Sequence, residues 1–353
     1  MSIEQKSRAM TFPRIGKFII IFFAIAFILA GARGYQLYRY VFEENVKNDY
    51  VILVTEEDDI KSISEKLETN EILFNMKAFK WVAKKKKYAD YMRPGRYELK
   101  KGMTTNELVN MLRSGAQSPV NITFNNVRFK EELAGKVSKY IKADSTSILQ
   151  LFSDEQQIND WGFTEENFRA MFIPNTYEMY WTTSAEEFAQ RMKTEYDRFW
   201  NDTRTKQAAK MGLTPQQVVT LASIVQSETI KPDELKTVAG LYINRLNKGI
   251  ALQADPTVKY AVGDYSLKRV LNKHLEIDSP YNTYKYAGLP PGPICFPEIT
   301  SVDAVLNYED HNYLYMCARE DFSGYHNFAK TLSQHNRNAK KYRDALNELR
   351  IYK

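Results

Sequence analysis

Cysteine and histidine are scarce in this chain, and their scarcity excludes several kinds of chemistry. The 353 residues include two cysteines and four histidines. The histidines follow no H-E-x-x-H pattern and the cysteines have no metal-ligand spacing, so we expect no metal and no cofactor. No G-x-S-x-G occurs, which argues against a Ser-His-Asp hydrolase with a nucleophile elbow. Cys295 and Cys317 could pair in an oxidising compartment, but we expect them to be buried and unpaired.

A strong charge of either sign is also missing. The formal net charge is +6, which is mild for this length and does not by itself indicate nucleic acid. It would suit an anionic membrane surface or an acidic polymer. The charged fraction of 26% and the hydrophobic fraction of 44% are ordinary for a globular protein, so disorder is not expected over most of the chain.

One apolar run near the N-terminus determines the expected location. Residues 18–32 carry no charge and are bracketed by Lys17 and Arg33. This run is shorter than the roughly 20 residues that span a bilayer core, but snorkelling cations and flanking aromatic residues extend it. We therefore predict a transmembrane anchor over residues 18–40. Basic residues precede it, so the positive-inside rule places residues 1–17 in the cytoplasm.

The predicted topology is a single pass through the cytoplasmic (inner) membrane, with everything after the anchor extracytoplasmic or periplasmic. A cleaved signal peptide is the alternative, because Ala30-Gly31-Ala32 resembles a cleavage site. The aromatic, apolar continuation favours an uncleaved anchor. Either location argues against nucleotide-driven enzymes and against a nucleic-acid partner.

The remaining sequence predicts two modules of α+β class. The first, residues 45–115, has a β-α-α-β-like pattern, and a linker follows it over residues 114–119. Its expected elements are a strand at 50–55, a turn that leads into a strand within residues 93–99, and helices at 59–67, 77–86 and 105–112. The second module, residues 120–353, is predicted to contain strands at 120–124 and 313–318 and helices at 130–141, 147–152, 185–200, 214–229, 234–247 and from about 338.

Glu228 occupies an unusual position on one of these helices. Thr214 and Gln217 form a capping box that starts the helix. Glu228 follows Ile224 by four residues and Val225 by three, so it lies on the apolar face and in the last turn. Desolvation and the helix dipole both favour the neutral carboxyl there, as a general acid requires. The alternative is that the helix ends earlier and leaves Glu228 solvated in a loop.

Polar, loop-rich clusters follow Glu228 and could form a groove for a polyhydroxylated ligand. They are Asn244-Arg245 with residues 252–257, then residues 279–284, then residues 288–294. Each cluster alone is equally consistent with plain turns. Glycoside hydrolysis normally uses two carboxylates, and the nearest candidates for a second are Asp233, Glu234 and Asp255.

Five motifs in order resemble the endolytic murein transglycosylase family, also called YceG-like. They are Leu221–Thr229 (LASIVQSET), Val238–Leu246 (VAGLYINRL), Leu252–Thr257 (LQADPT), Tyr281–Tyr284 (YNTY) and Gly288–Gly292 (GLPPG). The resemblance runs from about residue 120 to the C-terminus. Upstream, Pro94–Tyr97 and Gly102–Leu108 look like the family's LysM-like domain, and the anchor is also as in the family. Pro174–Tyr177 resembles a Pro-Asp-Thr-Tyr element, with Asn175 in place of the aspartate.

The resemblance implies an endolytic peptidoglycan lytic transglycosylase, a lyase that cleaves the MurNAc-β-1,4-GlcNAc bond inside glycan strands. It implies that Glu228 is both acid and base: it protonates the glycosidic oxygen and then deprotonates the muramoyl 6-hydroxyl, which leaves a 1,6-anhydro end. The family's motif has an earlier acid where this chain has Gln226. The resemblance therefore implies that a second carboxylate at this position is not needed for the acid/base step. Candidate substrate contacts are Asn244, Gln253, Asp255, Thr257, Tyr281 and Asn282. The same side chains could instead fix loops.

The expected partners are peptidoglycan glycan strands and, in the membrane, peptidoglycan synthases (penicillin-binding proteins). The enzyme would terminate the elongation of nascent strands. Two other functions stay open at this point. One is a muramidase-type hydrolase that uses water and a second carboxylate, and the other is a non-catalytic peptidoglycan-binding scaffold for synthases.

Overall fold

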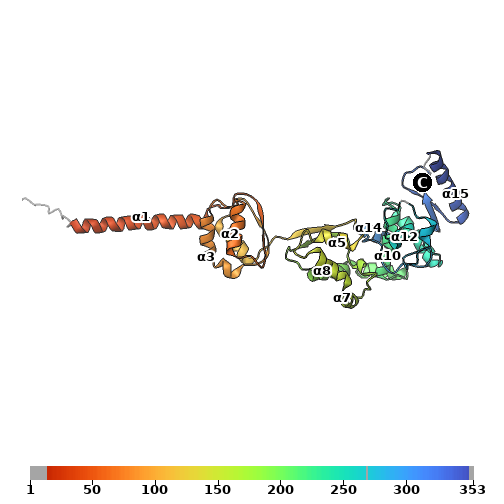
Figure 1. The fold of residues 1–353 in the computed structure, drawn as a ribbon, viewed down its shortest axis with the longest axis horizontal. Helices are drawn as coiled ribbons and strands as arrows, with labels where there is room; N and C mark the ends of the chain where they lie inside the picture. The colour runs from red at the N-terminus through yellow and green to blue at the C-terminus, as the bar shows by residue number, and fades with distance from the viewer. Residues whose placement is uncertain (1–13, 268, 350–353) are drawn as a thin grey trace, which may run out of the picture. The chain divides into compact units, whose positions relative to one another are not determined.

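The structure, a computed structural model, describes residues 14–267 and 269–349 and forms two compact units, Met1–Pro119 and Val120–Lys353 (Figure 1). Both units contain helices and a pair of antiparallel strands, and the second contains a further pair. The mixed α+β class predicted from the sequence is therefore confirmed.

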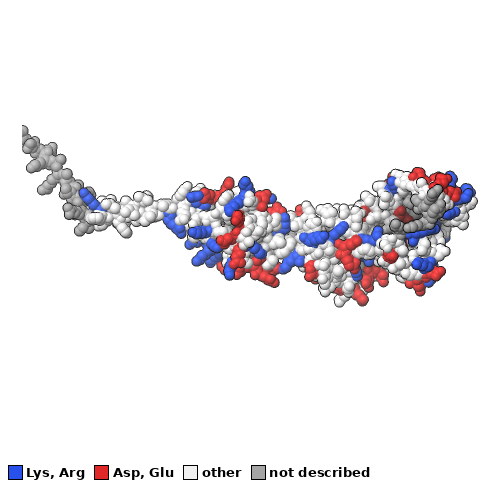
Figure 2. Space-filling model, turned by 45° about the horizontal axis from the view of Figure 1, so that its top comes forward, with Lys and Arg blue, Asp and Glu red and all other residues white. Residues whose placement is uncertain are grey.

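Helix α1 (Arg14–Phe42) is the predicted apolar helix, and it is longer than the sequence pattern indicated. Its segment Gly16–Phe42 is long and apolar enough to cross a membrane, and none of its most apolar window is buried. At about 1.5 Å per residue these 27 residues extend about 40 Å, against about 30 Å for a hydrocarbon core. In Figure 2 the middle of the helix is white, without charged side chains on the visible face.

The first unit contains one antiparallel strand pair packed with helices. Strand β1 (Tyr50–Val54) pairs with β2 (Gly95–Leu99), with Ile52 opposite Tyr97. Alternate residues of both strands are buried, as a half-covered sheet requires. Side chains of Asp59, Asn75 and Thr104 cap three helices. Those helices are α2 (Ile60–Thr69), α3 (Met76–Lys85) and α4 (Thr105–Ser114), with a 3-10 helix at Tyr88–Tyr91.

The second unit begins with strand β3 (Val120–Phe124), which pairs with β4 (Asn175–Met179). The sequence did not predict β4, although polar and apolar residues alternate along part of this short strand. Phe124 stacks on Tyr177 across the pair, at 5.6 Å between ring centroids. The helix predicted at 130–141 ends at Val137, so that prediction was too long. The helices are α5 (Lys130–Val137), α6 (Ser145–Gln150), α7 (Glu155–Asp160), α8 (Ala185–Phe199) and α9 (Asp202–Lys210), with 3-10 helices at Leu151–Ser153 and Phe168–Met171.

Helix α10 (Pro215–Glu228) forms the centre of the rest of this unit. It packs against α11 (Leu235–Asn247), α12 (Asp255–Val262) and α14 (Ile299–Leu306), and Figure 1 shows α10, α12 and α14 close together. Eight consecutive residues of α10, from Val218 to Val225, are buried. A helix covered on nearly every side is expected to be apolar all round, which explains the run LASIV.

The chain ends in a hairpin and a helix that pack on each other. Strand β5 (Tyr315–Ala318) pairs with β6 (His326–Ala329), and α15 (Leu332–Glu348) covers both. The sequence predicted neither β6 nor α14, nor the one-turn α13 (Asn272–Leu275). Thr331 caps α15, so this helix starts at Leu332 rather than near Asn338 as predicted.

Both cysteines are free, as predicted. Cys295 is buried. Cys317 lies on β5 and is only partly buried, so the prediction of burial holds for one of the two.

Candidate active site

Helix α10 brings Glu228 to the edge of the core. The backbone N–H of Gln217 donates to Thr214 Oγ1 at 3.3 Å, and the backbone N–H of Thr214 donates to Gln217 Oε1 at 2.9 Å, so the predicted capping box is present. Glu228 is the last helical residue, and Thr229 after it is extended at φ −136°. The alternative of an earlier helix end is therefore wrong. Glu228 is only partly exposed.

The Glu228 carboxyl is held by a buried tyrosine. The Tyr242 hydroxyl, on α11, donates to Glu228 Oε1 at 2.6 Å. Burial raises the pKa of Glu228 to about 7, the Tyr242 hydrogen bond opposes this rise, the charge of Asp255 adds to it, and the charge of Lys259 lowers it. Near neutral pH both protonation states are therefore populated, which suits a group that must act as acid and as base.

A cavity of about 360 Å³ lies against this carboxyl. Residues from α10, α11, α12, the β5–β6 hairpin and α15 surround it, so segments more than 100 residues apart in sequence meet there. The wall contains both polar and apolar residues. The polar and aromatic lining residues are Glu228, Tyr242, Arg245, Gln253, Asp255, Tyr284, Tyr315, His326 and His335, and the others are Leu241, Leu252, Leu314, Met316, Cys317 and Ala318.

Asp255 is the one of the three candidate second carboxylates that lines the cavity. It is the first residue of α12, and the Tyr284 hydroxyl donates to its Oδ1 at 2.6 Å. Asp233 accepts from the Tyr325 hydroxyl at 3.3 Å instead. Glu234 is buried and engaged elsewhere. The cavity thus contains two acids, Glu228 and Asp255, of which the first is partly desolvated.

Gln253 is a second predicted contact that lines the cavity. Its Oε1 accepts from the Arg245 guanidinium at 2.6 Å. Its φ is +53°, in the left-handed region, and its backbone N–H donates to the Thr283 carbonyl at 3.0 Å. A non-glycine residue in this region costs of order 1–3 kcal/mol, and such strain gathers at functional sites.

The other four predicted contacts do not line the cavity. Asn244 Nδ2 donates to the backbone carbonyls of the 311–313 loop at 2.6 and 3.2 Å. Thr257 is fully buried and donates to the Ala254 carbonyl at 2.8 Å. Asn282 Nδ2 donates to two carbonyls of the 275–277 turn at 2.8 and 2.9 Å. Tyr281 packs on Tyr260, at 4.5 Å between ring centroids. These contacts fix the loops around the site.

Sequence reasoning missed Tyr242, Tyr284 and His326. A signal existed for Tyr242, because it lies within the apolar face of α11 and a buried phenol needs a hydrogen-bond partner. His326 gave no signal, since it starts a strand that the sequence did not predict.

A buried carboxylate joins the end of helix α10 to the β5–β6 hairpin. Glu234 is 5% exposed, and its Oε2 accepts from the Thr229 hydroxyl at 3.1 Å. Its Oε1 accepts from the His326 backbone N–H at 2.7 Å, and His326 Nδ1 lies 2.9 Å from its Oε2. The residue that follows Glu228 and the first residue of β6 therefore share one anchor.

Gln226 does not line the cavity. Its Oε1 accepts from the Glu298 backbone N–H at 2.7 Å and from the Ser301 hydroxyl at 3.1 Å, at the start of α14. It thus satisfies one of the free N–H groups at a helix N-terminus. Residue 226 therefore needs a side-chain oxygen that can accept these two hydrogen bonds.

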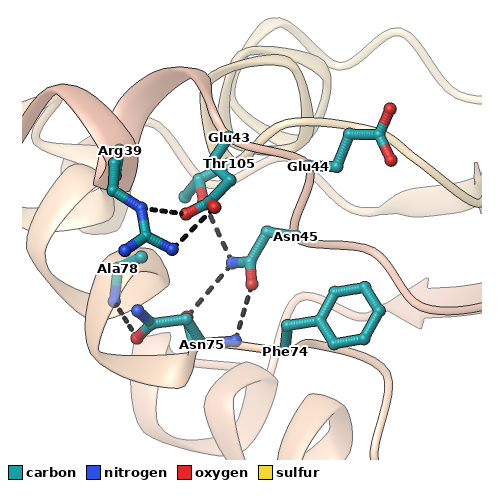
Figure 3. A pocket seen from close by; sticks show the side chains of 8 residues that line it. All are labelled: Arg39, Glu43, Glu44, Asn45, Phe74, Asn75, Ala78 and Thr105. Carbon is teal, nitrogen blue, oxygen red and sulfur yellow. Dashed lines mark hydrogen bonds and ion pairs between the residues drawn. The ribbon is translucent and has the colours of Figure 1, made fainter.

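The first unit contains a larger hollow of about 550 Å³, drawn in Figure 3. One of its acids, Glu43, forms an ion pair. Arg39 pairs with Glu43 at 2.7 Å, and this pairing lowers the pKa of Glu43. The buried Asn45 amide donates to Thr105 Oγ1 at 2.9 Å and accepts from the Asn75 N–H at 2.6 Å. The cavity at Glu228 holds a carboxyl whose pKa is raised, so it is the candidate active site. Within the described residues no group of three or more His, Cys, Asp and Glu could hold a metal.

The fold and the site together define an α+β protein with an N-terminal apolar helix and one acid poised near neutrality in a cavity. The chain belongs to the YceG-like family, whose model matches residues 52–341. It is 30% identical over 322 residues to the endolytic murein transglycosylase of Bacillus subtilis (strain 168), covering 87% of this chain and 88% of that protein.

Two further relatives agree. The endolytic murein transglycosylase of Streptococcus pneumoniae serotype 2 (strain D39 / NCTC 7466) is 27% identical over 363 residues, covering 91% of this chain and 64% of that protein. The crystal structure of the yceG-like protein lmo1499 from Listeria monocytogenes superposes with a TM-score of 0.54 at 28% identity, covering 82% of this chain and 98% of that one.

Proposed function

We propose that this protein is an endolytic murein transglycosylase, a lyase that cuts the MurNAc-β-1,4-GlcNAc bond inside peptidoglycan strands. The observation that carries the proposal is Glu228, whose pKa of about 7 lets one side chain both give and take a proton in the cavity. Membership of the YceG-like family and the names of the relatives support the same function.

The chemistry follows from one carboxyl. Neutral Glu228 donates its proton to the glycosidic oxygen as the bond from that oxygen to the anomeric carbon breaks. The carboxylate then takes the proton of the muramoyl 6-hydroxyl as its oxygen bonds to the anomeric carbon. Glu228 ends protonated, no water is consumed, and the product has a 1,6-anhydro end. Tyr242 orients the carboxyl and stabilises its charged form between the two steps.

We propose that Gln253 and Asp255 contact the substrate, because both line the cavity with Glu228. Asn244, Thr257, Tyr281 and Asn282 support the surrounding loops through the contacts described above. The test is digestion of defined glycan strands by the full-length protein in detergent, with the ends weighed by mass spectrometry. Anhydro ends are expected, and Glu228→Gln should abolish them.

A muramidase-type hydrolase is the second candidate, and the position of Asp255 favours it. A second carboxylate in the same cavity could activate water instead of leaving the reaction to the 6-hydroxyl. Reducing muramic acid ends would identify this reaction. Binding of strands without cleavage by the wild-type protein would instead indicate a scaffold.

We propose that residues 45–115 are a LysM-like unit and residues 120–353 the catalytic domain. The order strand, helix, helix, strand within the first unit supports the first assignment. We also propose that α1 anchors the protein in the cytoplasmic membrane with residues 1–17 inside. This topology would place the second unit on the extracytoplasmic side of the membrane, where nascent strands and peptidoglycan synthases, the expected partners, are found. Protease protection of each end in spheroplasts tests the orientation.

A further inference from the structure

A second, smaller hollow lies beside the catalytic cavity. Its volume is about 140 Å³. Ser227 and Pro256 line it, and the residues next to them, Glu228 and Asp255, line the catalytic cavity. Six residues surround this hollow: Arg128, Ser227, Pro256, Lys259, Tyr265 and Ile294.

Two cations of this hollow have no acidic partner. The Arg128 guanidinium stacks on the Tyr265 ring at 4.4 Å from its centroid. Lys259, on α12, lies close enough to Glu228 for its charge to act on that carboxyl. Within residues 14–267 and 269–349 neither side chain forms an ion pair. Cations without an ion pair beside an open hollow can bind an anion without first breaking an ion pair.

One lining residue of the hollow, Tyr265, has a hydroxyl without a partner in the part of the chain that the structure describes. Tyr265 Oη is buried and forms no hydrogen bond among the described residues. A buried donor that lacks an acceptor costs free energy unless a ligand supplies one. The phenol, the guanidinium and the ammonium are all donors, so the missing group is an acceptor with negative charge.

We propose that this hollow is a subsite for a carboxylate of the glycan strand, bound by Arg128, Lys259 and the Tyr265 hydroxyl. The inference rests on the proposed function, since a peptidoglycan strand is the substrate that brings carboxylates to a cavity beside Glu228. Two sources have this chemistry. One is the lactyl carboxylate of a muramic acid without its peptide, and the other is a free carboxylate of the peptide stem.

Binding, rather than cleavage, provides the test. Glu228→Gln protein, full-length in detergent, is titrated calorimetrically with three oligosaccharides: with stems, without stems, and without stems but with lactyl methylamides. In that background Arg128→Gln and Tyr265→Phe should each weaken binding of carboxylate-bearing strands by about 10-fold. The methylamide strands should lose less than 2-fold. If the variants lose affinity for stemless strands, the bound carboxylate is that of the lactyl group. If they lose affinity only for strands with stems, the bound carboxylate is that of the peptide.

The controls separate binding from folding and from net charge. Lys206→Gln removes an exposed positive charge on α9 and should not change the affinity. Tyr265→Phe should keep or raise the melting temperature, because it removes an unpaired buried hydroxyl, while it lowers the affinity. Equal losses on all three oligosaccharides, or no loss on any, overturn the subsite. Neither result concerns the proposed cleavage, which is read from the products of the wild-type protein.

Discussion

Replacing Tyr242 with Phe should move the pH dependence of cleavage to higher pH. The Tyr242 hydroxyl donates to Glu228 Oε1 at 2.6 Å, and Tyr242 is buried. The bond stabilises the carboxylate, so its loss favours the neutral acid. The acid step requires that neutral form, and activity falls as pH rises through the pKa of Glu228, at about 7. Without this hydrogen bond, the loss of activity should occur at higher pH.

The size of the change follows from the type of hydrogen bond. A hydrogen bond to a charged group contributes roughly 1.5–3 kcal/mol, and one pKa unit corresponds to about 1.4 kcal/mol. The pKa of Glu228 should therefore rise from about 7 to roughly 8–9 in Tyr242→Phe. The measurement is kcat/KM on defined glycan strands between pH 5 and 10, with anhydro ends counted by mass spectrometry.

Tyr284→Phe is the matched control. It removes a phenol from the same cavity, but that phenol donates to Asp255 and not to Glu228. Its alkaline limb should stay near pH 7. In Tyr242→Phe, the alkaline limb of the kcat/KM profile should move to higher pH. If it stays in place or moves to lower pH, Tyr242 is not the donor that stabilises the Glu228 carboxylate. Circular dichroism at each pH excludes unfolding as the cause.

Three further predictions concern the same helix and its anchor. Glu228→Gln should lower kcat at least 100-fold, and it should also change stability. The pKa of Glu228 in the folded protein, about 7, exceeds the ordinary value of 4.5. Burial of Glu228 therefore does not lower the free energy of unfolding of the wild type below pH 4.5, but it lowers it by up to about 3 kcal/mol as pH rises to 7. In urea unfolding, Glu228→Gln should therefore be more stable than the wild type at pH 8 and equally stable at pH 4.5. Equal stability at pH 8 would contradict the raised pKa. Gln226→Glu should leave the pH limb in place and raise the melting temperature slightly, since a carboxylate at the start of α14 suits the helix dipole; a shifted limb would mean that residue 226 acts on Glu228. Glu234→Gln should destabilise the protein by about 1–3 kcal/mol, because His326 and Thr229 lose a shared buried acceptor; unchanged unfolding would contradict that role.

Local patterns in the sequence were sufficient to predict helix α10, which carries Glu228. The capping box at Thr214 and the apolar face beneath Glu228 depend on residues only a few positions apart. The strand at 120–124 and the helix at 185–200 were predictable for the same reason. The strands β4 and β6 were not predicted, because a strand of four or five residues is stabilised mainly by its pairing partner.

The candidate site was predictable only in part. Glu228 stood out because its burial conflicts with its charge. The roles of its neighbours depend on contacts between distant segments, such as Asn282 with the 275–277 turn and Tyr242 with Glu228. Sequence alone could not separate Gln253, which lines the cavity, from Thr257, which is fully buried four residues later.

The shared anchor at Glu234 has a consequence for the order in which the site is made. His326 and His335 complete the cavity wall, and both lie in the last 30 residues of the chain. A chain synthesised from its N-terminus and exported in that order has Glu228 outside the membrane well before these residues. On the proposed topology, the cavity closes only when the C-terminal hairpin docks on Glu234. On that topology, the proposed cutting site forms only after the hairpin and α15 have also been exported.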